Sequence, residues 1–551
     1  MNYLIPLTIL FPLAAGIAIF MAGSKGKGLA PFGVLAAGVT LLLSIMVVYQ
    51  TFEGLEKERT ASAPVIPAIQ YSPDWMKIDL PIAISGEKVQ WKLGFGADGV
   101  GAMMVFLTGL AFAAASIFAL GQIKHRLHQY IALLLVTESL LLGVFLSMDL
   151  VTFYIFFEAV LLPLMLLING WGDPKLALKA SRKFLLFTLA GSVPMVIGFI
   201  GLALQANGQG MPSSVDFQSL SSLAMQQQES AISAGQVTMS DYIGGQRWIV
   251  WLLLLGFGIK LAVLPLHTWL PSTYAVSHPN TTSVVASVVA KLGVFGILRV
   301  VLPLTPMGLA YEAQLLFGTL GAVAIVYGAL VALSQSDLRK VFAYSSISHM
   351  GFVTVGLMSL NMDGISGAAI QMFNHGVITC SMFLILGLLE QRRPGVNFKM
   401  EDLGLAALYP RIAVLLVFFT LAGAGLPGLN GFVGELLAMM GMTRVSAAIT
   451  AVAVLGTVLG AWYGLRVVQR LLFGSDGAGR TKHVDDVSSD CNASEFATLA
   501  CMALVCLYIG VRPSGPMKMI ESDVKRLVRV TEPASKQAHP QMDTLAQSPS
   551  N

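Results

Sequence analysis

The sequence predicts an all-α polytopic membrane protein with about 14 transmembrane helices, and three observations support this fold class. Hydrophobic residues make up 55% of the 551 residues, while charged residues make up only 12%. The mean hydropathy is +0.73. Apolar stretches of about 20 residues, the length that spans a bilayer, recur along the chain. Because such a composition would be insoluble in a globular protein, we expect one membrane-embedded bundle.

The apolar stretches follow one another closely, and each is a candidate span. The first lacks a basic leading segment, so we expect a retained helix and not a cleaved signal peptide. The candidate spans, in chain order, cover residues 3–22, 29–50, 100–122, 129–147, 149–169, 183–204, 248–269, 279–302, 312–334, 341–361, 364–389, 408–441, 445–472 and 495–512.

Basic residues gather in the odd-numbered connections between these spans. They are Lys25, Lys27, Lys124, Arg126, the runs 175–183 and 392–411, Arg339, Lys340 and the run 470–482. The positive-inside rule puts these connections in the cytoplasm and both termini on the outer face. Two long polar connections, 51–99 and 205–247, then lie outside. We expect the second of these, and the tail after Pro513, to lack regular structure.

Four charged side chains lie deep inside the predicted spans. Glu158 is about nine residues into its span, which places it about 14 Å deep in a hydrocarbon core of about 30 Å. Lys260 and Lys291 are similarly central, and Glu435 follows a glycine-rich interruption. Each charge costs about 3 kcal/mol in lipid, so we expect the four to face one another or water.

Two predicted spans are interrupted beside these charges. In the seventh, Pro265 removes a backbone donor just after Lys260. In the twelfth, residues 423–431 read GAGLPGLNG and precede Glu435. Spans 4 to 8 and spans 9 to 13 form two successive groups of five helices, and each interruption falls in the fourth helix of its group. Because each group has an odd number of spans, the second group would be inverted in the membrane relative to the first. Inverted repeats with paired broken helices are typical of secondary ion transporters.

This repeat predicts four regions along the chain. We expect N-terminal helices with an outer loop at 1–99 and a first antiporter-like half at 100–302. A second half follows at 303–473, and a C-terminal helix with a polar tail at 474–551.

The buried charges allow two interpretations. Desolvated carboxylates and lysines can exchange protons near neutral pH, which favours a proton or cation relay. The alternative is a static structural pair between Glu158 and a lysine. His349, His375, Glu138 and Lys183 are further candidates, and Glu138 would be a pore-mouth group. The structural alternatives are that His349 and His375 simply bond across helix interfaces and that Lys183 reaches the membrane interface by its long stem.

Four cysteines, Cys380, Cys491, Cys501 and Cys506, show no paired spacing that is typical of metal ligands. We therefore expect no metal, haem or iron–sulfur centre in this chain.

Six ordered blocks resemble the antiporter-like membrane subunits of respiratory complex I. They are FYIFFEAVLLPLMLLINGWG (153–172), IKLAVLPLHTWLP (259–271), SVVASVVAKLGVFGILR (283–299), QSDLRKVFAYSSISHMGF (335–352), QMFNHGVITCSMFLILG (371–387) and AGAGLPGLNGFVGE (422–435). The resemblance covers about spans 3 to 13. Glutamate in place of lysine in the twelfth helix makes the chain most similar to the M type. The family usually has aspartate directly after HTWLP and often histidine two residues later, whereas Ser272 and Tyr274 stand here.

The resemblance implies roles for the buried residues. Glu158 matches the fifth-helix glutamate, Lys260 the lysine of the broken seventh helix, and Lys291 the central eighth-helix lysine. Glu435 matches the terminal site in the twelfth helix. His349 and His375 match the histidines of the polar axis along the membrane arm.

The resemblance also implies a function and its surroundings. We expect a proton-translocating, non-redox subunit of NADH:quinone oxidoreductase in the bacterial inner membrane. NADH, FMN, iron–sulfur clusters and quinone would be bound by partner subunits. The expected partners are the L- and N-type subunits, small membrane subunits and lipid, with no nucleic acid. The alternatives are an Mrp-type cation/proton antiporter subunit, a hydrogenase-linked relative and a purely structural membrane subunit.

Overall fold

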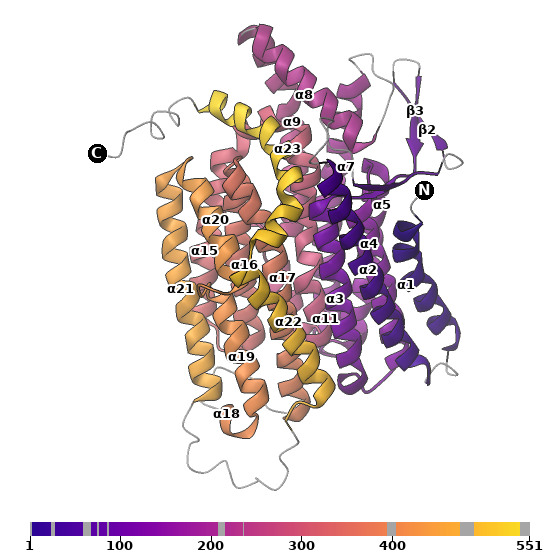
Figure 1. Cartoon of the computed structure of the whole chain (residues 1–551), viewed down its shortest axis with the longest axis vertical. Coiled ribbons are helices and arrows are strands. Elements are labelled where there is room, and N and C mark those ends of the chain that lie inside the picture. Colours follow the sequence, from indigo (N-terminus) through magenta and orange to yellow (C-terminus); the bar gives the residue numbers. More distant parts are fainter. Residues whose placement is uncertain are drawn as a thin grey trace.

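A computed structural model describes residues 3–23, 28–58, 68–73, 77–84, 87–207, 215–234, 236–393, 404–473 and 490–539. The helices pack side by side in one bundle with their long axes roughly parallel (Figure 1). Twelve helices of this described part are long and apolar enough to cross a membrane. The predicted spans 248–269 and 408–441 are not among the twelve, so the count of 14 stays a prediction. Lys25 and Lys27 lie outside the described residues.

The first part of the chain supplies the helices that carry Glu138, Glu158, Lys183 and Lys260. They are α1 (Leu4–Met21), α2 (Ala30–Glu58), α3 (Gly99–Gln122), α4 (Leu127–Leu146), α5 (Leu150–Ala159), α6 (Leu161–Trp171), α7 (Ala177–Asn207), α8 (Phe217–Ala234) and α9 (Gln236–Leu261). The fifth predicted span is thus two helices, α5 and α6. They meet at Val160, three residues before Pro163, a residue that cannot donate a backbone hydrogen bond.

The middle of the chain holds both the predicted break in the seventh span and an unpredicted one in the eighth. The elements are α10 (Trp269–Val276), α11 (Pro279–Ser287), η2 (Val289–Lys291), α12 (Leu292–Gly296), η3 (Ile297–Val301), α13 (Leu302–Leu304), α14 (Pro306–Gly308) and η4 (Leu309–Ala313). The predicted interruption after Lys260 is confirmed, because α9 ends at Leu261 and α10 begins only at Trp269.

The eighth predicted span is not the continuous α-helix we expected. A short 3₁₀ segment, η2, contains Lys291, and the π-helical segment η3 follows one short α-helix later. Such irregular turns inside a helix often mark functional sites. No proline or glycine precedes Lys291 within the apolar run 284–290, so the sequence carries no local signal for this irregularity.

The last part of the chain contains the second predicted break. Its helices are α15 (Gln314–Ser334), α16 (Leu338–Met358), α17 (Met362–Arg392), α18 (Leu405–Leu408), α19 (Pro410–Gly423), α20 (Asn430–Thr443), α21 (Ala447–Leu472), α22 (Ala493–Val511) and α23 (Ser514–Ala538). The interruption before Glu435 is confirmed, since α19 ends at Gly423 and α20 begins at Asn430. Gly425 and Gly428 have φ angles of 73° and 91°, a conformation that favours glycine.

Both polar connections contain regular structure in their described parts. The connection 51–99 holds four short strands, β1 (Ile69–Tyr71), β2 (Lys77–Ile84), β3 (Glu87–Lys92) and β4 (Phe95–Ala97). β1 pairs with β4, and β2 pairs with β3, both antiparallel. The prediction of an irregular 205–247 connection is wrong for its described part, because α8 lies within it. We call the end of the bundle that carries β2, β3 and α8 the hairpin end (Figure 1).

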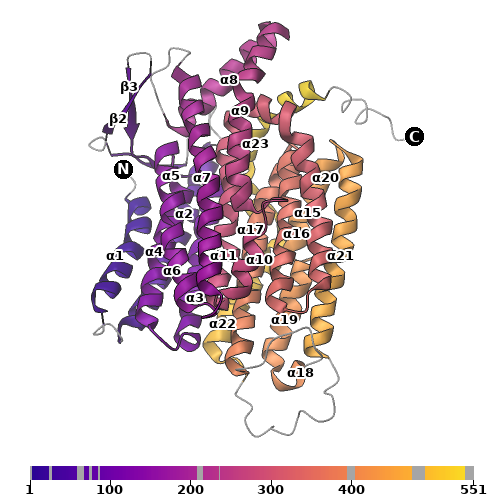
Figure 2. The same ribbon diagram turned by 180° about the vertical axis from the view of Figure 1, so that it is seen from behind.

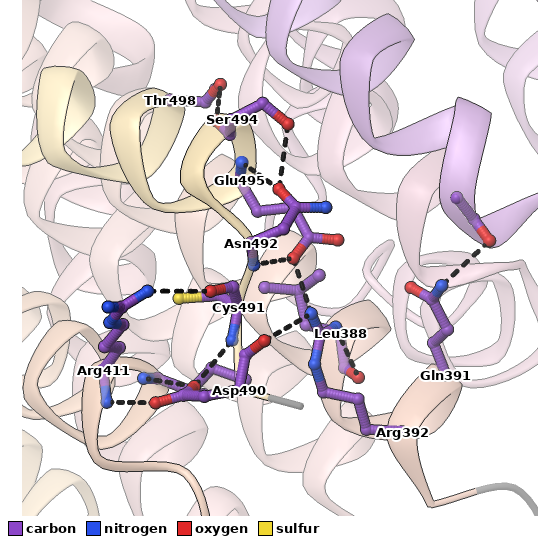
Figure 3. Close-up of polar contacts among 12 residues, drawn as sticks. Leu388, Gln391, Arg392, Arg411, Asp490, Cys491, Asn492, Ser494, Glu495 and Thr498 are labelled. Atoms are coloured by element: carbon purple, nitrogen blue, oxygen red, sulfur yellow. Dashed lines mark hydrogen bonds and ion pairs between the residues drawn. The ribbon is translucent and has the colours of Figure 1, made fainter. Parts of the chain in front are cut away.

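The opposite end of the bundle, which we call the basic end, carries α18 (Figure 2). There a polar cluster fixes the start of α22 against α17 and α19 (Figure 3). Arg392 and Glu495 form an ion pair of 2.5 Å, and both side chains are 8% exposed. The Asp490 carboxylate accepts the backbone N–H of Arg411 at 2.7 Å, and a capping box joins Asn492 to Glu495. These contacts hold the start of α22 in the bundle. Residues 474–489, which precede this cluster, lie outside the described part of the chain.

The tail after Pro513 is not disordered as we predicted, because residues 514–538 form α23. This helix lies across the hairpin end. The Asp523 carboxylate accepts the backbone N–H of Val100 at 2.9 Å, and Arg526 lies 3.6 Å from Asp98. Asp98 in turn forms a buried ion pair with Arg299 of η3. Residues 540–551 lie outside the described part of the chain.

Docking of α23 is expected to weaken as the pH rises from about 4 to about 7. Burial, and next the nearby Asp98 carboxylate, raise the pKa of Asp523 to about 7. An undocked aspartate has a pKa of about 3.9, so the docked state binds more protons between these values. Arg526 and Arg299, the cations that also face Asp523, oppose this shift. Hydrogen exchange of α23, corrected for intrinsic rates, should be about 100-fold faster at pH 8 than at pH 5. The Asp523→Asn variant should lose this pH dependence, and an unchanged dependence would assign it to another group.

Candidate functional site

Glu158 and Lys260 meet inside the first half of the bundle. Lys260 Nζ lies 3.5 Å from Glu158 Oε1, and the two side chains are 4% and 16% exposed. The same ammonium donates to the backbone carbonyl of Phe157 at 2.9 Å and lies 3.3 Å from the centroid of that residue's ring. At an effective dielectric of about 20, charges at this separation attract by about 5 kcal/mol. The two residues predicted to pair therefore do so in the structure.

Local features of three helices position this pair. The junction between α5 and α6 follows directly after Glu158, where Pro163 leaves the preceding turn short of one backbone donor. Ser192 of α7 donates a short hydrogen bond to Glu158 Oε1. Helix α7 comes this close to α9 because Gly191 faces Gly256, where a Cβ atom would lie 2.7 Å from the Gly191 carbonyl oxygen.

Lys183 lies at the break in the seventh span and is not paired with a carboxylate in the described structure. Its ammonium donates to the carbonyl oxygen of Thr268 at 2.7 Å and to Ser272 Oγ at 3.0 Å. Ser272, which departs from the family pattern, therefore serves as an acceptor here. Tyr274, the other departure, is fully buried and packs edge-on against Phe383 at 5.4 Å between centroids.

Lys291 pairs with His375 between the two halves. The fully buried ammonium lies 2.7 Å from His375 Nδ1 and also donates a short hydrogen bond to the Ala286 carbonyl oxygen. Gly376 allows α17 to approach α11 here, because a Cβ atom would lie 2.9 Å from the Ser287 carbonyl oxygen. Since the ammonium is a donor only, His375 Nδ1 is the acceptor, and the ring proton sits on Nε2.

Glu435 lies in the second half, at the start of α20, and is bonded to His349. His349 Nδ1 is 2.7 Å from Glu435 Oε1, and Gln371 Nε2 donates to the same oxygen at 3.0 Å. The other ring nitrogen, His349 Nε2, is 3.0 Å from the Tyr463 hydroxyl. Gly434 brings α20 close to α17, since a Cβ atom there would lie 2.8 Å from the Gln371 Cα atom.

Among the described residues, no direct hydrogen bond or ion pair joins the three pairs to one another. The rings of His349 and His375 have centroids 5.5 Å apart, and no hydrogen bond between them is found in the described residues. Both rings line a cavity of about 40 Å³. Since about 10–15 Å³ of such space holds one water molecule, water can bridge the two rings. Among the described residues no hydrogen bond or ion pair joins Lys260 to Lys291 either.

Glu138 forms no direct hydrogen bond or ion pair with any of these three pairs among the described residues. Its carboxyl group is fully buried in α4, and neither oxygen has a hydrogen-bond partner among the described residues. An unpartnered carboxylate is costly in such a place, so the protonated form is favoured. The proposed pore-mouth role of Glu138 stays a prediction.

Several polar residues of these pairs escaped the sequence interpretation. Ser192, Gln371 and Tyr463 each bond a predicted site residue, yet each is a single uncharged residue in an apolar run. Only their position within a predicted span could have drawn attention to them. The sequence offers no signal that tells which charged partner each one would meet.

Comparisons with known proteins show the family of the chain. Residues 147–460 match the family model described as NADH:quinone oxidoreductase/Mrp antiporter, transmembrane. Subunit M of the NADH-quinone oxidoreductase of Rhodobacter capsulatus is 33% identical, with 99% of each chain covered. Chain 4 of the NADH-ubiquinone oxidoreductase of Chondrus crispus is also 33% identical, over 76% of this chain and 80% of the relative.

Solved structures with the same fold include members of two kinds of complex. A chain of respiratory complex I from Thermus thermophilus with bound NADH has a TM-score of 0.77 at 28% identity, covering 95% of this chain and 99% of that one. A chain of the Mrp complex from Dietzia has a TM-score of 0.73 at 19% identity, covering 98% and 99%, and this likeness concerns the fold alone. By the match to its family model and by its full-length relatives, the chain belongs to the NADH:quinone oxidoreductase/Mrp antiporter transmembrane family.

Proposed function

We propose that this chain is a proton-translocating, non-redox membrane-arm subunit of an NADH:quinone oxidoreductase. One observation carries the proposal, namely the buried series of titratable pairs that runs from Glu158 and Lys260 past Lys291 to Glu435. Each end of this series lies at an interrupted helix. At such a break, backbone N–H and C=O groups that no longer form intrahelical hydrogen bonds can bind ions or water. The names of the full-length relatives, which are subunits of NADH-quinone oxidoreductases, favour this function over other ion transport.

The first step is a change in the Glu158–Lys260 pair. While Glu158 is close, its negative charge keeps the Lys260 ammonium protonated. Loss of an attraction of about 5 kcal/mol corresponds to a factor of more than 1,000 in proton affinity, at about 1.4 kcal/mol per tenfold. Separation of the pair, triggered by quinone reduction in partner subunits, therefore lets Lys260 release its proton toward Lys291.

The second step moves the charge from Lys291 toward Glu435. Lys291 donates to His375 Nδ1, and water in the cavity beside His349 and His375 completes the connection. His349 then delivers a proton to Glu435 through its Nδ1 atom. Release from Glu435 to the outer side completes one cycle. The residues act only as proton donors and acceptors, with no redox chemistry in this chain.

The orientation follows from the basic residues. We propose that the basic end, with Arg339 and Arg392, faces the cytoplasm of a bacterium and that the hairpin end and both termini face outward. The regions 100–302 and 303–473 would be the two inverted antiporter-like halves, flanked by 1–99 and 474–551. Glu138 and Lys183 would serve as auxiliary groups near the first half.

The remaining components belong to partner subunits. NADH, FMN, the iron–sulfur clusters and quinone would be bound outside this chain. L- and N-type subunits and small membrane subunits would adjoin it in the membrane arm. The long apolar helices α1 and α21 expose large side chains to lipid or to these neighbours.

An Mrp-type cation/proton antiporter subunit is the second candidate, because the Dietzia Mrp chain has the same fold. Purification of the native complex through a tag on this chain distinguishes the two. We expect flavin, iron–sulfur clusters and NADH:quinone reductase activity coupled to proton uptake into vesicles. A complex without flavin that exchanges Na⁺ for protons would establish the antiporter instead. Omission of Na⁺ should leave proton translocation by the expected complex unchanged.

A further inference from the structure

We propose that Ser345 and Tyr463 form a proton-uptake branch that reaches Glu435 through His349 from the basic end, without passing Lys291. This inference rests on the proposed function and adds two residues to it. Neither was predicted as a site residue from the sequence.

The hydrogen bonds of this branch are continuous. Ser345 Oγ is 2.7 Å from the Tyr463 hydroxyl, which is 3.0 Å from His349 Nε2. His349 Nδ1 then lies 2.7 Å from Glu435 Oε1. All three distances fall within or near the normal range for hydrogen bonds, so no water is needed between Ser345 and Glu435.

The same bonds leave no room for a direct transfer from His375. Both ring nitrogens of His349 already face other partners, Tyr463 on one side and Glu435 on the other. His375 Nε2, in contrast, has no hydrogen-bond partner among the described residues. In this arrangement the bonded route to Glu435 therefore begins at Tyr463 and not at Lys291.

The bond directions form a consistent relay. Because a carboxylate only accepts, His349 Nδ1 carries the proton that faces Glu435, and Nε2 accepts from the Tyr463 hydroxyl. Tyr463 in turn accepts from Ser345. When Glu435 takes the Nδ1 proton, Nε2 takes the Tyr463 proton, Tyr463 takes that of Ser345, and Ser345 takes one from water. Each group gains one proton and loses one, so only the terminal water and Glu435 change their charge.

A cavity connects this branch toward the basic end. Phe342 and Ser345 line it from the first two turns of α16, and Gly464 and Val467 line it from the last turns of α21. Both sets of residues lie toward the end of the bundle at which Arg339 bonds Glu390 and Arg466 bonds the Leu333 carbonyl oxygen. Ser345 is half-buried, whereas Tyr463 is only 7% exposed. Water can therefore reach Ser345 before it reaches the histidine.

The tyrosine is a positioning residue as well as a carrier. Its hydroxyl fixes the tautomer of His349, because donation to Nε2 leaves the ring proton on Nδ1, opposite Glu435. A phenylalanine at this position keeps the ring and its packing but removes the hydroxyl. The ring could then turn either nitrogen to Glu435, and the connection to Ser345 would be broken.

The test follows protonation of Glu435 in the intact complex in proteoliposomes. A rapid acid jump on the basic-end side is monitored by the infrared band of the Glu435 carboxyl group, which is assigned with Glu435→Gln. We expect Tyr463→Phe to slow this protonation roughly tenfold or more and to change its solvent deuterium isotope effect, since a positioned acid–base group contributes about 10²–10⁴-fold. Ser345→Ala should slow it in the same sense.

Tyr274→Phe is the matched control. Tyr274 is a fully buried tyrosine whose hydroxyl has no hydrogen-bond partner among the described residues, so its loss should not change the rate. Unchanged kinetics and isotope effects in both Tyr463→Phe and Ser345→Ala would overturn the branch. If Tyr463→Phe does not assemble, the half-buried Ser345→Ala decides the question alone. Because the measurement uses the resting complex, a failure here is distinct from failure of coupling to NADH oxidation, which Lys260→Met tests.

Discussion

Replacement of Lys260 with methionine is expected to abolish proton translocation coupled to quinone reduction. Methionine has a similar length and fills the space of the lysine stem. It cannot carry a proton, however, and it has no charge that interacts with the Glu158 carboxylate. The ammonium bonds to Phe157 and Glu158 are lost together. We expect the pumping rate in proteoliposomes to fall about 100-fold or more, the range for loss of an acid–base group. Acidification measured with a pH-sensitive dye, at a matched amount of assembled complex, gives the result.

Two further variants separate a relay from a static pair. Glu158→Gln alone leaves Lys260 buried without its countercharge, so it should impair pumping even if the pair is only structural. The double variant Glu158→Gln with Lys260→Met removes both charges and so relieves that cost. A structural pair predicts that pumping returns in the double variant, whereas the relay predicts that it stays lost. Full pumping by Lys260→Met alone would refute the role of this lysine.

The pairing of Glu158 with Lys260 could be predicted because few arrangements let a charged side chain lie in the membrane at a low free-energy cost. A glutamate and a lysine at similar depth in lipid must meet each other or water, and Glu158 and Lys260 meet. The two broken helices were equally predictable. Pro265 and the run 423–431 cannot continue an α-helix without loss of backbone hydrogen bonds, so the interruptions follow from local chemistry.

The contacts across helices could not be predicted in the same way. Tyr463 meets His349 only because α21 packs beside α16. An uncharged tyrosine in an apolar run does not carry the free-energy cost of a buried charge, so its sequence context does not indicate a partner. The irregular turn at Lys291 likewise lacks a proline or a glycine pair. It depends on packing of α11 against α17.

Helix α23 was missed for a different reason. Its polar composition indicates disorder when the segment is taken as a whole. Yet Ile520, Val524 and Leu527 follow a helical spacing and are buried against the bundle. Periodicity within the tail was therefore the signal that would have predicted this helix, and average composition concealed it.

Lys291→Met is the second change with a large expected effect. Lys291 lies 2.7 Å from His375 Nδ1, and its side chain is fully buried. Methionine removes the donor to His375 Nδ1, so a proton leaving Lys260 has no acceptor ahead of it. We expect coupled pumping to fall by about tenfold or more, with quinone reduction slowed in parallel if the two are tightly coupled.

A matched control is Lys57→Met, which removes a lysine whose side chain is 75% exposed and pairs with Glu53 in its own helix. Loss of this surface pair should leave pumping intact, because exposed ion pairs contribute little to stability. Lys291→Arg then tests the need for a titrating group. Arginine stays charged and cannot give up its proton, so a relay predicts that it fails as methionine does. If Lys291→Arg pumps normally, Lys291 supplies only a fixed positive charge, and the proton must cross between the two halves by water alone.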